Sequence, residues 1–115
     1  MATPPEEFSI STREIDGRAH VTLRGELDLA TAPELEQLLI ERIDASQEVV
    51  VDLRGLEFMD SSGIRVLVAA HARAGRTGTR LFIVRPEPDS AVAKIITVAG
   101  LERELNILDD PAQAA

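Results

Sequence analysis

Three consecutive valines, Val49–Val51, followed by Asp52 and Leu53, form a short and almost entirely apolar run. Such a run fits a strand that is buried on both faces, as parallel strands between helices are. Leu81–Val84 is a second run of this kind. Between the two runs, residues recur at helical spacing and predict a helix over 61–74: Ile64, Leu67, Val68 and His71. A strand, a helix and a strand in this order favour a parallel sheet with a helical crossover.

The rest of the chain continues the alternation of strand and helix patterns. We expect strands over 8–13, 19–25 and 105–108, a hairpin turn at Asp16-Gly17, a connection over 54–60, and helices over 31–44 and from Asp89 or Ser90 to Ala99. Thr31 and Glu34 form a capping-box pattern at the start of the first helix, and Gly75 is the expected end of the second. The order predicts an α/β domain with a mixed, mostly parallel sheet flanked by helices.

The length of 115 residues allows one domain, and an apolar content of 44% is enough to fill its core. We expect this domain over residues 8–110. Residues 1–7, in which Pro and Glu recur, are expected to be a flexible N-terminus, and residues 111–115 a flexible C-terminal tail.

The formal net charge of −8 argues against nucleic acid and anionic membranes as partners, because binding to phosphate groups depends on lysine and arginine. Aromatic residues make up 3% of the chain, which removes base stacking as a mode of recognition. The sequence has no cysteine, no apolar segment of the ~18 residues that a membrane-spanning helix needs, and no secretory signal pattern. We therefore expect a cytoplasmic protein.

Sequence patterns typical of enzymes and of cofactor-binding proteins are absent. The chain has no GxSxG, P-loop or GxGxxG motif, and its two histidines, His20 and His71, lack the spacing of a metal-binding pair. His20 is expected on the polar face of a strand, and His71 on the apolar side of a helix. We expect no enzymatic activity, no cofactor and no bound metal.

The segment Asp60-Ser61-Ser62-Gly63 lies between a predicted buried strand and the helix that follows it. In parallel sheets, ligands and partners meet the loops at the carboxyl ends of the strands. Asp and Ser are preferred N-cap residues, so this segment can serve the helix start alone. A cap needs only one such residue, however, and a surplus hydroxyl at the positive end of a helix offers a phosphorylation site. The residues leave both interpretations open.

Three separated parts of the chain carry a resemblance to a known family: residues 49–64, Gly25–Asp28 with Ala32-Pro33, and Val98–Leu101 with Leu105–Ile107. In order and spacing they resemble the STAS domains of anti-sigma factor antagonists of the SpoIIAA/RsbV kind. The resemblance covers nearly the whole chain and implies the STAS fold.

The resemblance also implies a bacterial signalling protein that regulates transcription by partner switching. The unphosphorylated form would bind an anti-sigma factor, which is also a serine kinase of the GHKL type, and so release a sigma factor. Phosphorylation of Ser62 would end this binding, and a PP2C-type phosphatase would restore it. The partner-interface positions implied by the family motif are Asp28, Asp60, Ser61, Ser62 and Gly63, with Ser61 as the alternative phosphorylation site.

Several of these residues also have a purely structural interpretation. Gly63 either lets a partner backbone approach closely or is a permissive residue in the first helical turn. Asp28 either lies at the interface or begins the turn before the first helix. Phe58 and Met59 either present an apolar patch beside the serines or fill the core beneath the loop.

The same fold also hosts scaffold or accessory STAS modules, such as stressosome-like or transport-associated proteins, because a fold does not determine a function. This is the alternative function for the chain. Large assemblies in size-exclusion chromatography would favour the scaffold, whereas phosphate on Ser62 would favour the switch.

Overall fold

Strand β2 (Arg18–Leu27) buries every second residue from Ala19 to Leu27, and the sheet is built around it. The computed structural model describes residues 8–114. The other elements, in chain order, are β1 (Ser9–Ile15), α1 (Ala32–Asp44), β3 (Val49–Asp52), β4 (Leu56–Met59), α2 (Ser61–Thr77), β5 (Leu81–Val84), α3 (Ala91–Val98), α4 (Leu101–Glu104), β6 (Asn106–Leu108) and the short 3-10 helix η1 (Pro111–Ala114).

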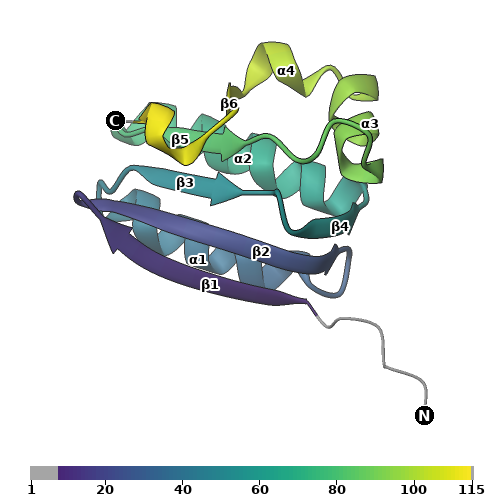
Figure 1. Ribbon diagram of the computed structural model, residues 1–115. Helices are drawn as coiled ribbons and strands as arrows, with labels where there is room; N and C mark the ends of the chain where they lie inside the picture. The colour runs from purple at the N-terminus through teal and green to yellow at the C-terminus, as the bar shows by residue number, and fades with distance from the viewer. Residues whose placement is uncertain (1–7, 115) are drawn as a thin grey trace.

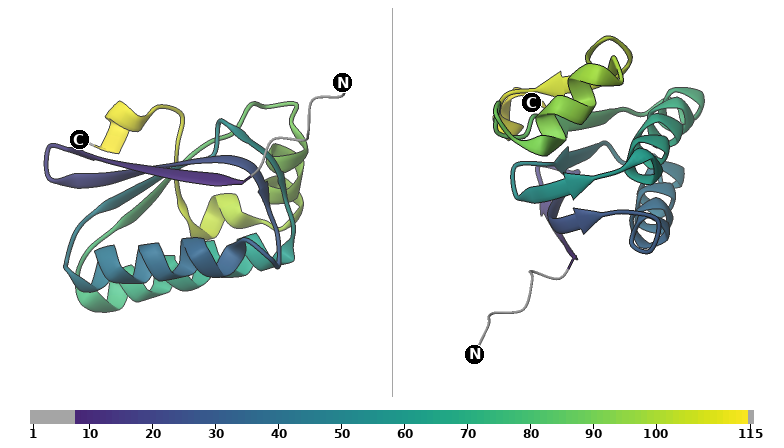
Figure 2. Two further views of the ribbon diagram at one scale, coloured as in Figure 1. Left: turned by 90° about the horizontal axis from the view of Figure 1, so that it is seen from below. Right: turned by 90° about the vertical axis from the view of Figure 1, so that its right-hand side faces the viewer.

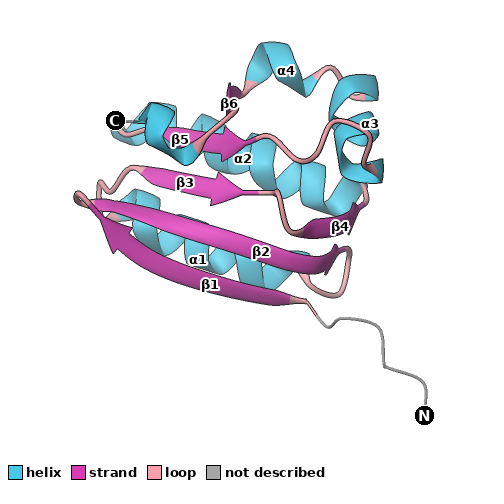
Figure 3. Cartoon of the chain, viewed as in Figure 1, coloured by secondary structure: helices cyan, strands magenta, loops and turns pink. Residues whose placement is uncertain are grey.

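The six strands form one sheet in the order β1-β2-β3-β5-β6, with β4 paired to β2 (Figures 1 and 3). β1 and β2 are an antiparallel hairpin whose turn residues Asp16 and Gly17 have φ angles of 52° and 80°. All other pairs are parallel. The first half of β2 pairs with β3, from Ala19 with Val49, and its last residues pair with β4, up to Leu27 with Met59.

Helices α1 and α2 form a layer on one face of the sheet. α1 and α2 run next to each other across one face, and α3 and α4 cover the core beside β4 and β6 (Figure 2). The main apolar core lies between these helices and the sheet. The opposite face of the sheet carries η1, which packs on a smaller apolar cluster: Val50, Phe82, Val84, Leu108 and Ala114.

The structure confirms the predicted α/β fold with a mixed, mostly parallel sheet, and it corrects the bounds of several elements. β4 lies within residues 54–60, which were predicted to be a connection, and α4 was not predicted. α2 continues through Gly75 to Thr77 and ends at Gly78, because Gly78 adopts the left-handed conformation (φ 79°) that a helix C-terminus often requires. β1 extends to Ile15, beyond the predicted end at residue 13.

The C-terminal residues differ from the predicted flexible tail. Residues 111–114 form η1, and Ala114 is buried against the second apolar cluster. The predicted flexible N-terminus over residues 1–7 lies outside the described residues.

The capping box predicted at Thr31 and Glu34 is wrong. Thr31 precedes α1, but its side chain makes no cap hydrogen bond to the helix. The Thr31 hydroxyl instead donates to the carbonyl oxygen of Glu26 at 3.0 Å and accepts from the backbone N–H of Asp28 at 2.9 Å. The approach of Thr31 to the end of β2 therefore replaces the local cap that the sequence pattern favoured.

The connection between β3 and β4 is held by an ion pair between Asp52 and Arg54. The guanidinium Nε and Nη2 of Arg54 donate to the Asp52 carboxylate at 3.0 and 2.7 Å, and the backbone N–H of Arg54 donates to it at 2.9 Å. Burial raises the pKa of Asp52, but these hydrogen bonds outweigh burial, so the pKa lies below its ordinary value of 3.8. The pair shapes the turn that leads into β4.

Gly63 sets how closely the first turn of α2 approaches the sheet. A Cβ atom at this position would lie 2.6 Å from Cγ of Met59 and 2.8 Å from Cδ2 of Leu27. Both neighbours are fully buried core residues, so neither has room to move away. Only glycine allows the helix to begin at this distance from the ends of β2 and β4.

We expect Gly63→Ala to lower the free energy of unfolding by roughly 1–3 kcal/mol, because the added methyl group overpacks the core. Gly75→Ala is the matched control: a Cβ at Gly75 has no other atom within 4 Å, and Gly75 is also helical. This control should raise stability by about 0.5–1 kcal/mol through helix propensity. Urea unfolding of both variants measures the difference, and a Gly63→Ala protein stabilised like the control would contradict this account.

The lowered pKa of Asp52 means that its ionised form stabilises the fold. This contribution is complete above the unfolded pKa, near 3.8, and is lost as the pH falls through the lower folded pKa. We expect Asp52→Asn to reduce stability at neutral pH by roughly 0.5–1 kcal/mol, because the partly exposed pair is screened by solvent. Urea unfolding curves between about pH 7 and pH 3 should show the deficit shrinking with acidification; a constant deficit would exclude the ion pair as its cause.

Candidate functional site

The candidate site lies where β2 and β4 end, at one end of the molecule (Figure 1). Because these strands are parallel neighbours, their carboxyl ends meet at the same edge of the sheet. The backbone N–H of Asp60 donates to the carbonyl oxygen of Leu27 at 3.1 Å, which continues the pairing past the strand ends. The segments after β2 and β4 thus lie together, and they carry all five residues predicted for the site: Asp28, Asp60, Ser61, Ser62 and Gly63.

Asp60 is the N-cap of α2. Its carboxylate accepts a hydrogen bond from the backbone N–H of Ser62 at 2.8 Å. Its carbonyl oxygen accepts from the N–H groups of Gly63 and Ile64 at 3.1 and 3.2 Å. Asp60 thus satisfies two of the donors that a helix start leaves without partners, those of Ser62 and Gly63, and its bond from Ile64 is the first regular bond of the helix.

Ser61 and Ser62 are therefore not needed as caps. Ser61 is exposed and Ser62 is partly exposed, so neither side chain is sealed inside the protein. Among residues 8–114, neither hydroxyl has a hydrogen-bond partner, since only the backbone of Ser62 takes part in the cap. The two hydroxyls stand at the positive end of the α2 dipole and are available for modification or contact.

Gly63 and Asp28 both shape the backbone around the candidate site. Gly63 is buried with its Cβ position directed at the core, so its contribution to the site is to place Ser62. The Asp28 carboxylate accepts from the backbone N–H groups of Ala30 and Thr31 at 3.0 and 3.2 Å, and the hydroxyl oxygen of Thr31 lies 3.1 Å from it. These bonds shape the loop that leads from β2 into α1, beside the start of α2.

Four carboxylate residues lie in or next to the strand ends that lead to the two serines. Glu26 and Asp28 come from the end of β2, and Glu57 and Asp60 from β4 and its end. Glu26 lies directly opposite Phe58 in the β2–β4 pairing, and Glu26, Glu57 and Phe58 are all exposed. Arg65, in the second turn of α2, is the nearby cation along the helix. A phosphate on either serine would add charge to a surface that is already acidic.

Two apolar residues at this end of the molecule are exposed. The sequence analysis did not name Leu29, and it left open whether Phe58 is exposed or buried. Leu29 follows Asp28 in the loop before α1 and is 77% exposed, and Phe58 of β4 is 39% exposed. Met59, by contrast, is fully buried, so it fills the core. The available clue to Leu29 in the sequence was a leucine within a loop, where polar residues are usual. Periodicity cannot show whether other residues bury such a leucine.

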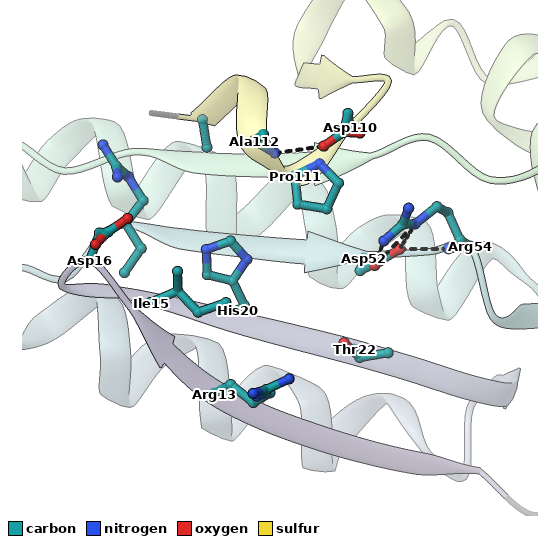
Figure 4. Close-up of a pocket in the computed structure, with 12 residues that line it drawn as sticks. Arg13, Ile15, Asp16, His20, Thr22, Asp52, Arg54, Asp110, Pro111 and Ala112 are labelled. Atoms are coloured by element: carbon teal, nitrogen blue, oxygen red, sulfur yellow. Dashed lines mark hydrogen bonds and ion pairs between the residues drawn. The ribbon is translucent and has the colours of Figure 1, made fainter.

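A second concave region lies on the other face of the sheet, between the β1–β2 hairpin and η1 (Figure 4). It encloses about 530 Å³, with His20 and Thr22 of β2 among the residues that line it. Most of its charged groups already have partners: Asp52 binds Arg54, Arg18 binds Glu48, and the Asp110 carboxylate accepts from the N–H of Ala112. None of the residues predicted for the site lines this groove.

The described residues offer no sign of metal chemistry or of a membrane span. Over residues 8–114, no three side chains of His, Cys, Asp or Glu come together as a metal site would require. No helix in that part of the chain combines the length and the apolar character needed to cross a bilayer.

Known proteins that this chain resembles share both its sequence pattern and its fold. The anti-sigma-F factor antagonist RsfB of Mycobacterium tuberculosis is 31% identical over 104 residues, which cover 90% of this chain and 83% of the relative. A crystal structure of an anti-sigma factor antagonist from Mycobacterium paratuberculosis superimposes with a TM-score of 0.84 at 28% identity, covering 99% of this chain and 95% of that one.

The Bacillus cell fate determinant SpoIIAA, whose structure is known in a phosphorylated form, has the same fold. Its TM-score is 0.68 at 19% identity, and the match covers 94% of this chain and 96% of SpoIIAA. The family model of the STAS domain matches residues 9–114, from the first strand to the end of η1. The chain belongs to the STAS domain family.

Proposed function

We propose that this protein is an anti-sigma factor antagonist whose binding is switched off by phosphorylation of Ser62. The observation that carries the proposal is the partly exposed Ser62 side chain, which has no structural task at the start of a helix that Asp60 already caps. The names of the relatives support the partner class, since RsfB and the Mycobacterium paratuberculosis protein are both anti-sigma factor antagonists. The unphosphorylated chain binds an anti-sigma factor, and a sigma factor is released.

The anti-sigma factor is also the kinase in this proposal, of the GHKL serine kinase type, and a PP2C-type phosphatase removes the phosphate. Both steps take place in the cytoplasm. The exposure of Ser62 supports its role as an acceptor, because a hydroxyl must reach the terminal phosphate of ATP. Ser61 is the neighbouring acceptor, more exposed but one residue earlier in the helix.

The phosphate acts on the interface rather than on the fold. It adds about 1.5 to 2 negative charges beside Asp60, in a surface that a bound partner must dehydrate. Each ~1.4 kcal/mol of repulsion or lost hydration weakens binding about tenfold, so a few kcal/mol suffice. The core beneath is unaffected, because the cap of α2 uses Asp60 and the packing uses Gly63.

Substitutions at Ser62 should separate binding from switching. Ser62→Ala is expected to bind the anti-sigma factor with an affinity close to wild type and to accept no phosphate at this position. Ser62→Asp should bind at least about tenfold more weakly, because a carboxylate mimics part of the phosphate charge. Ser61→Ala is the control: it should bind and still be phosphorylated on Ser62. Isothermal titration calorimetry gives the affinities, and mass spectrometry after incubation with kinase and ATP locates the phosphate.

Two results would contradict the proposal in different ways. Phosphate found on Ser61 alone would move the switch to the neighbouring residue. Equal binding by Ser62→Ala and Ser62→Asp, with both proteins folded by circular dichroism, would refute the argument from charge.

A further inference from the structure

We propose that Leu29 and Phe58 are the apolar anchors by which the protein holds its anti-sigma factor, and that the partner receives them in an apolar pocket rimmed by basic side chains. This inference rests on the proposed function and extends it to residues that the family motif did not single out. The two residues are called the anchor pair below.

The exposure of the anchor pair is the first observation. Leu29 leaves 77% and Phe58 39% of its surface open to solvent, and only two other large apolar residues are comparably exposed in the described chain: Ile15 and Val98. Exposed leucine and phenylalanine side chains lose the stabilisation that burial would give them. Leu29 makes no contribution to the core that explains its apolar character.

The position of the anchor pair is the second observation. Leu29 directly follows Asp28, and Phe58 lies two residues before Asp60, while the backbones of Leu27 and Asp60 are joined by a hydrogen bond. Short lengths of chain thus keep both residues near the end of the sheet where α2 begins. Phe58 points to the opposite face of the sheet from Met59, which packs against the start of α2. The proposed partner therefore spans this end of the sheet and covers Ser62 and the anchor pair together.

The charge around the anchor pair defines the chemistry of the partner. Glu26 and Glu57 flank Phe58, one across the β2–β4 pairing and one along β4, and Asp28 adjoins Leu29. An apolar centre with a charged rim is the usual anatomy of a protein interface, and complementary rims speed association. Because this rim is acidic, the matching rim of the partner is basic.

The anchor pair also explains why a phosphate on Ser62 is effective. Apolar anchors hold an interface by excluding water around them. A phosphate placed on this surface must lose its hydration or keep the two surfaces apart, and in both cases the anchors lose their contact with the pocket. The switch therefore needs no rearrangement of either protein.

The anchor is tested with Leu29→Ser and a matched control, Ile15→Ser. Ile15 is a similarly sized exposed residue at the turn end of the β1–β2 hairpin, about 30 Å from the far end of β2 at ~3.3 Å per residue. Calorimetric titration with the anti-sigma factor should show binding at least about tenfold weaker for Leu29→Ser and within about twofold for Ile15→Ser. Phe58→Ser should weaken binding too, and its melting temperature shows whether the half-covered ring also supports the fold.

The basic rim is tested by reversing one acidic charge. Glu57→Lys and Glu41→Lys change the net charge equally, but Glu41 lies near the far end of α1, away from the anchor pair. Stopped-flow measurements at low salt should show slower association for Glu57→Lys and an unchanged rate for Glu41→Lys. Equal rates for the two variants would overturn the basic rim.

The outcomes distinguish this inference from the proposed function. If Leu29→Ser and Phe58→Ser bind like wild type while Ser62→Asp does not bind, the switch stands and the anchor pair is refuted. If the wild-type chain binds none of the anti-sigma factors of its organism, the proposed function fails, and the anchor pair with it.

Discussion

The parallel pairing of β4 with the last residues of β2 is the contact on which the candidate site depends. It brings two strand ends that are more than 30 residues apart in sequence to one edge, and a hydrogen bond from Asp60 to Leu27 extends it into the loops. α2 begins directly after Asp60, the donor of this bond. The loop that leads into α1 begins directly after Leu27, the acceptor. Without this pairing, neither the carboxylates nor the serines would share a surface.

The first turn of α2 divides its tasks among neighbouring residues. Asp60 satisfies backbone donors, Gly63 allows the close approach to Leu27 and Met59, and within residues 8–114 the hydroxyls of Ser61 and Ser62 have no hydrogen-bond partner. Because the cap and the core rest on other side chains than the serines, a charge can be added at the surface while the cap and the core keep their contacts. This separation is the physical basis of the switch that we propose, which acts on binding alone.

The elements with strong apolar patterns were predictable, whereas those that depend on distant partners were not. Two strands and one helix form as expected: the runs at 49–53 and 81–84 and the periodic helix from residue 61. In each of them the spacing of the apolar residues indicates whether one face or both faces are buried. β4 has only four residues, of which two are buried, and it exists because the extension of β2 offers it hydrogen bonds. Likewise, Thr31 bonds to the end of β2 instead of capping α1.

The residue pattern alone specified the class of fold, the place of the Asp-Ser-Ser-Gly segment before a helix, and the family to which that segment points. The three-dimensional packing decided which residue caps α2, that Asp60 bonds to Leu27, that Met59 is buried, and that Leu29 and Phe58 stay exposed. Local spacing controls which backbone conformations a segment favours. The residues that bury a side chain or bond to it come from distant parts of the chain, so they are determined only by the folded structure.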